Sequence, residues 1–378
     1  MKFAYTLLLL LSFLLLSCKE TTKNTLVSNK APKNEIQYAS GLAIYKYDGY
    51  SVVKVLNPWP KAEKPFTYIL KQQNGVVPDS LHDYTTVTVP LQKLVVTSTT
   101  IIPFLEMLDS ETKLIGFPHT DYISSTKTRA LIDSGKVRDV GQNESLNIEL
   151  LFDMQPDAIV TFGVDNTNPM VDKLTSNGLK ILFQGDWMEQ SPLGKAEWIK
   201  FYATLLGKEK EGDSIFNSIA SNYQQTLTLV KDLAPQEKVL YGSMYKDQWF
   251  VARGNSWIAQ FLQDAKADYL WKDLAGMGSE PLSFESVFDT AAHADVWITN
   301  GSIMSLDQLL EENHHYAKFD AFQHKNVYSF ESQKGATGGT IYYETAPSRP
   351  DLVLKDYIKI FHPAVLPNYT FTFAKKLD

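Results

Sequence analysis

One sequence block occurs twice in this chain, once in each half. Residues 146–163 read LNIELLFDMQPDAIVTFG, and residues 282–301 read LSFESVFDTAAHADVWITNG. In both copies a helix-capping residue precedes an amphipathic run, which leads through an Asp to a short β-rich segment and a Gly. Each copy is therefore expected to form a capped helix followed by a buried parallel strand. Because the copies lie in different halves, the chain is predicted to contain two similar α/β lobes.

The segments around the repeat alternate between strand and helix patterns, which is typical of a mainly parallel sheet covered on both faces. The predicted fold is α/β, with two Rossmann-like lobes joined by one long interlobe helix. That helix is expected at 213–233, after a break at 207–212, and would form a rod about 32 Å long. A hairpin signal, Asp48-Gly49, marks a small N-terminal β extension. The expected segments are 35–90 for the extension, 91–192 for the N-terminal lobe, 193–234 for the helical linker and 235–378 for the C-terminal lobe.

The N-terminal residues indicate where the protein is expected to reside. Lys2 precedes an apolar run, 7–16, that is too short to span a bilayer, so residues 1–17 are predicted to be a signal peptide. The sole cysteine, Cys18, ends a Leu-Leu-Ser-Cys string that resembles a bacterial lipobox, in which the cysteine is acylated after cleavage. The alternative is an ordinary secretory signal with an unrelated cysteine. The expected location is the cell envelope, with a lipid anchor at Cys18 and residues 18–34 as a tether to the membrane.

Composition excludes several functional classes. A net charge of −7 over 378 residues gives no reason to expect a nucleic acid as partner. A single cysteine rules out an intramolecular disulfide framework. Aromatic residues make up 12%, which suits a cleft that binds a bulky ligand through stacking and apolar contact. Several bidentate arginine contacts to a highly anionic ligand are not expected, because the arginines are few. They are Arg129, Arg138, Arg253 and Arg349.

The sequence lacks the common signatures of enzymes and metal sites. It contains no G-x-S-x-G, no H-E-x-x-H and no G-x-x-x-x-G-K-[ST] motif. His314 and His315 are adjacent, so their side chains diverge on a helix or a strand. His119 is expected in a loop at a strand end, but a zinc site needs three or four converging ligands, which cannot be assembled around it. We therefore predict no catalytic residue, no resident metal and no cofactor.

From residue 91 to about residue 365 the chain resembles the cobalamin and iron-siderophore class of ABC-importer substrate-binding proteins. The similarity rests on the lipobox, on the strings KLVVTST and KLIGF, on the first repeat block preceded by VGQNES, on LLGKEKEGDSIFNSI and on the second repeat block. The resemblance implies that a ligand is held between two lobes joined by one long helix. It also implies that the receptor, a monomer, delivers this ligand to the permease dimer of an ABC importer.

Glu149 and Glu285 occupy matching positions in the two repeat blocks, two residues after the cap. In the family that the chain resembles, glutamates at these motif positions dock into arginine pockets on the two permease subunits. The alternative is that an acid in a first helical turn is simply stabilised by the helix dipole. The dipole explains one glutamate well, but it explains less well why both lobes carry one. Permease docking is therefore the predicted role of both residues.

Candidate ligand-binding residues follow from the position of the loops. Ligands of parallel α/β sheets bind beyond the carboxyl ends of the strands, so loops at predicted strand ends supply the candidates. They are Thr99, His119, Tyr122 and Trp187 in the N-terminal lobe, and Tyr245, Trp249, Arg253 and Trp257 in the C-terminal lobe. Trp249 and Trp257 could equally belong to the core.

The predicted function is delivery of a bulky metal chelate to an ABC importer by a lipid-anchored receptor. An iron(III)-siderophore is the first choice of ligand, because few arginines favour a neutral, amphipathic chelate. Cobalamin follows, and haem is third, with Tyr122, His119 or Tyr245 as candidate axial ligands. Two alternatives come from other classes: a secreted α/β hydrolase and a structural surface lipoprotein.

Overall fold

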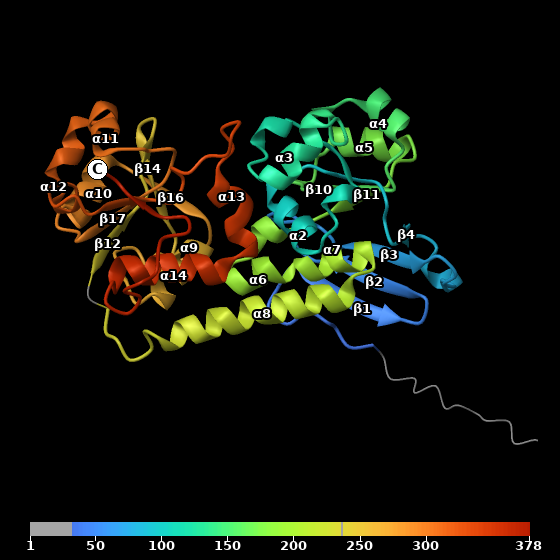
Figure 1. Ribbon diagram of the computed structural model, residues 1–378, viewed down its shortest axis with the longest axis horizontal. Helices are drawn as coiled ribbons and strands as arrows, with labels where there is room; N and C mark the ends of the chain where they lie inside the picture. Colours follow the sequence, from blue (N-terminus) through green and yellow to red (C-terminus); the bar gives the residue numbers. More distant parts are fainter. Residues whose placement is uncertain (1–31, 236) are drawn as a thin grey trace, which may run out of the picture. The chain divides into compact units, whose positions relative to one another are not determined.

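A computed structural model describes residues 32–235 and 237–378 of the chain (Figure 1). Residues 33–378 form one compact unit. The predicted signal peptide, Cys18 and most of the predicted tether lie outside the described residues. None of the helices in the described part combines the length and the apolar character needed to cross a membrane.

The N-terminal β extension is a four-stranded sheet in the order β1-β2-β3-β4. Its strands are β1 (Leu42–Tyr47), β2 (Tyr50–Val55), β3 (Phe66–Gln72) and β4 (Thr85–Val89). β1 and β2 form the hairpin predicted from Asp48-Gly49, and Gly49 adopts a φ of 80°, which favours glycine. β3 pairs antiparallel with β2 and parallel with β4. One face of this sheet contributes to the main hydrophobic core of the molecule.

Two buried carboxylates tie the extension to the helical linker and to the loop before it. Glu197 accepts hydrogen bonds from the backbone N–H groups of residues 37–39, at 2.6 to 3.0 Å. Glu189 accepts from the N–H groups of Ser40 and Gly41, both at 2.8 Å. Lys200 donates to the Glu197 carboxylate at 2.8 Å and so neutralises it. The extension is therefore held by charge-assisted hydrogen bonds as well as by apolar packing.

The N-terminal lobe contains a five-stranded sheet in the order β11-β10-β5-β6-β7. Every neighbouring pair in it is parallel. The strands are β5 (Leu94–Val96), β6 (Leu114–Phe117), β7 (Arg138–Asp139), β10 (Ala158–Thr161) and β11 (Ile181–Phe183). The helices of this lobe are α2 (Ile102–Met107), α3 (Thr126–Asp133), α4 (Ile148–Met154) and α5 (Pro169–Ser176). Two short strands, β8 (Gly141–Gln142) and β9 (Ser145–Leu146), form a hairpin just before α4.

The C-terminal lobe has a similar sheet in the order β15-β12-β17-β18-β19, with an antiparallel edge strand. Its strands are β12 (Lys238–Tyr241), β15 (Asp268–Tyr269), β17 (Val296–Thr299), β18 (Val327–Ser329) and β19 (Lys375–Lys376). A second, antiparallel sheet consists of β13 (Met244–Tyr245), β14 (Gln248–Ala252) and β16 (Ser279–Leu282). The helices are α9 (Trp257–Asp264), α10 (Phe284–Ala291), α11 (Leu306–Glu312), α12 (Asp320–Gln323), α13 (Ile341–Thr345) and α14 (Pro350–Phe361).

The linker consists of α6 (Pro192–Glu197), α7 (Ile199–Leu206) and α8 (Glu209–Thr228). Figure 1 shows the long helix α8 running past α7 at one end and α14 at the other, and both helices contact it. The predicted start of this helix was wrong, because Gly207 alone ends α7, with a φ of 68°, and α8 begins two residues later. Glu209 and Glu211 then lie in the first turn, where the helix dipole favours acids.

The repeat folds as predicted, as a helix followed by a parallel strand in each lobe. α4 is capped by the Asn147 side chain and α10 by that of Ser283. The repeated Asp has a role that the sequence did not reveal. Asp157 accepts the backbone N–H of Lys93 at 2.9 Å, and Asp295 accepts that of Lys238 at 2.8 Å. Each Asp thus fixes the start of the neighbouring parallel strand, β5 or β12, which confirms the symmetry of the two α/β lobes.

Candidate functional site

Two adjoining cavities lie between the lobes, with volumes of about 380 and 360 Å³. We refer to them together as the interlobe site. Most of the lining comes from the carboxyl ends of β5, β6, β10 and β11, where ligands of parallel sheets bind. The lining residues shared by both cavities are Ser98, Thr99, Phe162 and Tyr343. The C-terminal lobe contributes residues 339–347, from α13 and its flanking loops.

Aromatic and hydroxyl side chains dominate the interlobe site. Tyr122, Trp187 and Tyr343 are 61%, 41% and 52% exposed, so a large part of each residue is accessible to a ligand. Aromatic rings of this kind bind bulky ligands through apolar contact and stacking. Hydroxyl groups in such a site can form hydrogen bonds that fix the orientation of a bound ligand. The hydroxyl-bearing residues, apart from the tyrosines, are Thr97, Ser98, Thr99, Thr100 and Thr340.

One acid and one base, both buried, supply the charged part of the lining. Thr100 donates its hydroxyl to the Asp186 carboxylate at 2.9 Å. Lys195 Nζ donates to the carbonyl oxygens of Asp186 and Trp187, at 2.9 and 3.2 Å. Burial raises the pKa of Asp186 and lowers the pKa of Lys195, and the attraction between the two charges opposes both shifts. These two lining groups have opposite charges, so together they add no net charge to the lining.

Three of the predicted N-terminal-lobe residues lie together in the interlobe site. Thr99, Tyr122 and Trp187 all line it. His119 lies at the edge of this group, with its ring 5.4 Å from that of Tyr122. Its backbone has a φ of 51° and its side chain is exposed. The structure therefore brings three of the four predicted residues of this lobe to one cavity lining, and their role in ligand binding stays a prediction.

The predicted residues of the C-terminal lobe lie elsewhere. Tyr245 is exposed next to the β13–β14 turn, and Arg253 forms an ion pair with Glu280. Trp257 is half-buried at the start of α9, with Lys195 Nζ 5.1 Å from the centre of its ring. The structure corrects the expectation for Trp249, which is fully buried in the core of the C-terminal lobe. We do not retain Trp249 in the proposed site, since it has no surface for a ligand.

The C-terminal lobe contributes to the interlobe site through a segment at 339–347, which the sequence did not identify as part of the site. Gly339, Thr340 and Tyr343 line the cavity, and they lie far along the chain from β12 and its loop. No local sequence pattern indicated that Tyr343 would line this cavity. The nearby Glu344 is buried, and burial raises its pKa to about 7, while hydrogen bonds from the N–H groups of Ser124 and Ser125 act in the opposite direction.

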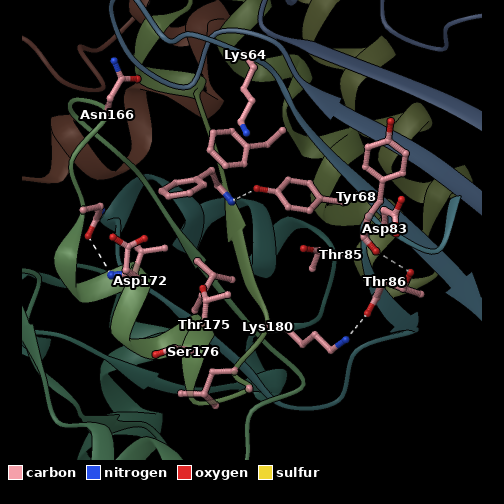
Figure 2. Close-up of a pocket in the computed structure, with 18 of the residues that line it drawn as sticks. Lys64, Tyr68, Asp83, Thr85, Thr86, Asn166, Asp172, Thr175, Ser176 and Lys180 are labelled. Atoms are coloured by element: carbon pink, nitrogen blue, oxygen red, sulfur yellow. Dashed lines mark hydrogen bonds between the residues drawn. The ribbon is translucent and has the colours of Figure 1, made fainter.

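A larger cavity, of about 930 Å³, lies on the N-terminal lobe and not between the lobes (Figure 2). Its walls come from the β extension on one side and from α5 and β11 on the other. Lys180 Nζ donates to the carbonyl of Thr86 at 2.7 Å, and the Tyr68 hydroxyl accepts the N–H of Phe183 at 2.8 Å (Figure 2). The carboxyl ends of four parallel strands converge on the interlobe site and not on this larger cavity.

The two repeated glutamates are exposed in the first turns of their helices. Glu149 lies in α4 and Glu285 in α10. Within the described part of the chain, neither carboxylate takes part in an ion pair. The same part of the chain contains no group of three or more His, Cys, Asp or Glu side chains able to hold a metal ion.

Comparisons with known proteins agree with this architecture. A family model described as periplasmic binding protein matches residues 94–334. An uncharacterized lipoprotein of Methanocaldococcus jannaschii is 25% identical over 366 residues, which cover 90% of this chain and 85% of that protein. A periplasmic heme binding protein from Pseudomonas aeruginosa has a similar fold, with a TM-score of 0.57 and 16% identity over 76% of this chain and 98% of that one.

The molybdate periplasmic binding protein MolA of Haemophilus influenzae is also similar in structure. The TM-score is 0.58, with 16% identity over 76% of this chain and 90% of that one. At this level of identity the structural similarity concerns the fold alone. The β extension at 35–90 precedes the region that the family model matches.

Proposed function

This chain belongs to the periplasmic binding protein family, and from that premise we propose that it delivers a bulky, neutral iron(III) chelate to an ABC importer. Proteins of this family are substrate-binding components of ABC transporters and not enzymes. The observation that carries the choice of ligand is the lining of the interlobe site, which combines exposed aromatic rings with a balanced charge pair.

The electrostatics of the site favour a ligand without a large net charge. Lys195 already donates to two carbonyl oxygens, and the Asp186 carboxylate lies nearby. An anionic chelate would therefore meet an ammonium group whose charge is largely balanced, and would gain little from it. A neutral iron(III)-siderophore of the hydroxamate type can instead stack against Tyr122, Trp187 and Tyr343 and accept hydrogen bonds from the threonine hydroxyls.

Cobalamin and haem are the alternative ligands. Both are large and partly apolar, and so suit the same aromatic lining. One observation favours haem: Tyr122 is exposed beside His119, and a phenolate or an imidazole can ligate haem iron. Tyr245, the third candidate axial ligand, is the last residue of β13 and is not among the residues that line the interlobe site.

We further propose that Cys18 carries a lipid and anchors the receptor in the cell envelope as a monomer. The lipobox-like string supports this, and so does the lipoprotein description of relatives in Methanocaldococcus jannaschii. The proposed receptor comprises the extension (35–90), the two lobes (91–192 and 235–378) and the linker (193–234). Glu149 and Glu285 are its proposed contacts with the permease dimer.

A ligand panel tests the proposed function. We expect an iron(III) trihydroxamate chelate to quench tryptophan fluorescence saturably, because Trp187 lies in the site. A Trp187→Phe variant should lose most of the quenching and keep binding within about tenfold, since phenylalanine retains an apolar ring. An iron(III) tricatecholate, cobalamin and haem complete the panel. Tighter binding of any of these three would contradict the proposed ligand.

A second expectation concerns how far the lobes move. Because α8 contacts helices at both ends and the linker helices share one hydrophobic core with both lobes, ligand binding should cause little closure. Small-angle scattering with and without the iron(III) trihydroxamate should give nearly the same radius of gyration. A decrease of several ångströms would contradict a rigid linker.

A further inference from the structure

A short segment of the C-terminal lobe reaches across to the N-terminal lobe, and we call residues 334–345 the strap. It begins with a hairpin in which Lys334 pairs with Thr340, and it continues as α13. Lys334 Nζ donates to Thr340 Oγ1 and to Ser302 Oγ, both at 2.6 Å, and so fixes the hairpin to its own lobe. Tyr342 is buried against Phe330, at 5.3 Å between ring centres. The start of the strap is therefore held to the C-terminal lobe by hydrogen bonds and by aromatic packing.

The tip of the strap contacts residues 121–125 of the N-terminal lobe. Thr337 donates its hydroxyl to the carbonyl of Asp121 at 2.7 Å. Gly339 approaches so closely that a Cβ atom there would lie 2.2 Å from the carbonyl oxygen of Tyr122, and a Cβ atom on Gly335 would lie 2.6 Å from Ser124 Cα. Only glycine allows the two backbones to come this near.

Glu344 makes the strongest of these contacts. Its carboxylate accepts the backbone N–H groups of Ser124 and Ser125, at 2.6 and 2.9 Å. These N–H groups lie at the start of α3, where Ser125 is the N-cap and where the helix dipole favours an anion. Glu344 is 2% exposed, so these hydrogen bonds are shielded from water. An acid from one lobe thus completes the cap of a helix in the other.

The same strap carries the residues through which the C-terminal lobe reaches the interlobe site. Thr340 and Tyr343 line the cavity, and Tyr343 immediately precedes Glu344. We propose that Glu344 is a positioning residue, which fastens the strap to α3 and thereby holds Thr340 and Tyr343 against a ligand in the interlobe site. The link to ligand binding rests on the proposed function, whereas the fastening of the strap does not.

Hydrogen exchange tests the fastening without any ligand. In Glu344→Gln one N–H acceptor is replaced by an amide donor, so the amides of Ser124 and Ser125 should exchange at least about tenfold faster. Gly339→Ala, which leaves Glu344 intact, should have the same effect by pushing the strap away from Tyr122. Unchanged exchange at both amides in both variants would overturn the proposal.

Asp356→Asn is the matched control. Asp356 is also a buried carboxylate that accepts backbone N–H groups, from Thr372, Phe373 and Ala374, but all of these belong to its own lobe. This variant should accelerate exchange at residues 372–374 and leave Ser124 and Ser125 protected. Faster exchange at Ser124 and Ser125 in the control would mean that any loss of a buried carboxylate opens the lobes, and would overturn the specific role of Glu344.

Ligand kinetics test the positioning role. With an iron(III) trihydroxamate as probe, Glu344→Gln should raise the dissociation rate at least about tenfold, because Thr340 and Tyr343 are no longer held in place. Faster exchange at Ser124 and Ser125 with an unchanged dissociation rate would overturn the positioning role. If the wild-type protein does not bind the probe, the proposed ligand is wrong, and the exchange data still decide whether Glu344 fastens the strap.

Discussion

Replacing Glu149 and Glu285 together by alanine is expected to reduce uptake into vesicles bearing the transporter at least about a hundredfold. The two carboxylates are exposed in matching first helical turns, one on each lobe, so a receptor with two similar lobes can present one acid to each subunit of a two-fold permease. Fold and ligand affinity should be unchanged, because an exposed acid contributes little to stability. Uptake by vesicles and ligand titration of the double variant measure the two effects separately.

A matched control separates docking from helix-dipole stabilisation. Asp172 and Asp307 are also exposed acids in first helical turns, in α5 and α11, again one in each lobe. The Asp172→Ala, Asp307→Ala double variant loses the same kind of dipole interaction, so it should transport at the wild-type rate. If uptake persists without Glu149 and Glu285, or if the control variant loses uptake equally, the docking assignment is refuted.

Replacing Trp249 by alanine is expected to destabilise the protein by roughly 3–5 kcal/mol. The indole is fully buried among aromatic rings, with centroid distances of 5.5 Å to Trp297 and 5.6 Å to Tyr316. Its Nε1 donates to the carbonyl of Tyr241 at 3.2 Å, and this carbonyl would lose its partner. Urea unfolding followed by circular dichroism gives the change in the free energy of unfolding.

Trp187→Ala is the comparison for this prediction. Trp187 is 41% exposed and lines the interlobe site, so its removal should change stability by no more than about 0.5 kcal/mol and should weaken ligand binding instead. A Trp249→Ala protein of wild-type stability with impaired binding would return Trp249 to the ligand site and would contradict its place in the core.

The strongest local patterns predicted the fold well, since they depend on residues close together in the sequence. The repeat gave both helix–strand units because caps, amphipathic spacing and a buried strand all agree within about twenty residues. The start of α8 was predicted too late because GKEKEG was interpreted as one long break. In the structure Gly207 ends α7, and the acids that follow stabilise the next helix.

The lining of the interlobe site was predicted in one lobe and missed in the other for a topological reason. In the N-terminal lobe the lining lies directly after β5, β6 and β11, so strand ends were sufficient to identify Thr99, Tyr122 and Trp187. In the C-terminal lobe the lining comes from the strap, which follows β18 and lies about ninety residues beyond the loop after β12. Its position depends on contacts with Ser124 and Ser125, more than two hundred residues earlier, and no local pattern reveals such contacts.

The buried carboxylates that hold the β extension also constrain the order in which the chain can fold. The backbone of residues 37–41 is bonded to Glu189 and Glu197, across sequence separations of 148 to 160 residues. Residues 37–41 therefore cannot complete these contacts until residues 189–197 have been synthesised. Contacts of such high order slow folding and leave the apolar face of the β1–β4 sheet unpacked in the meantime. The β extension is therefore among the last parts of the chain able to complete its tertiary contacts.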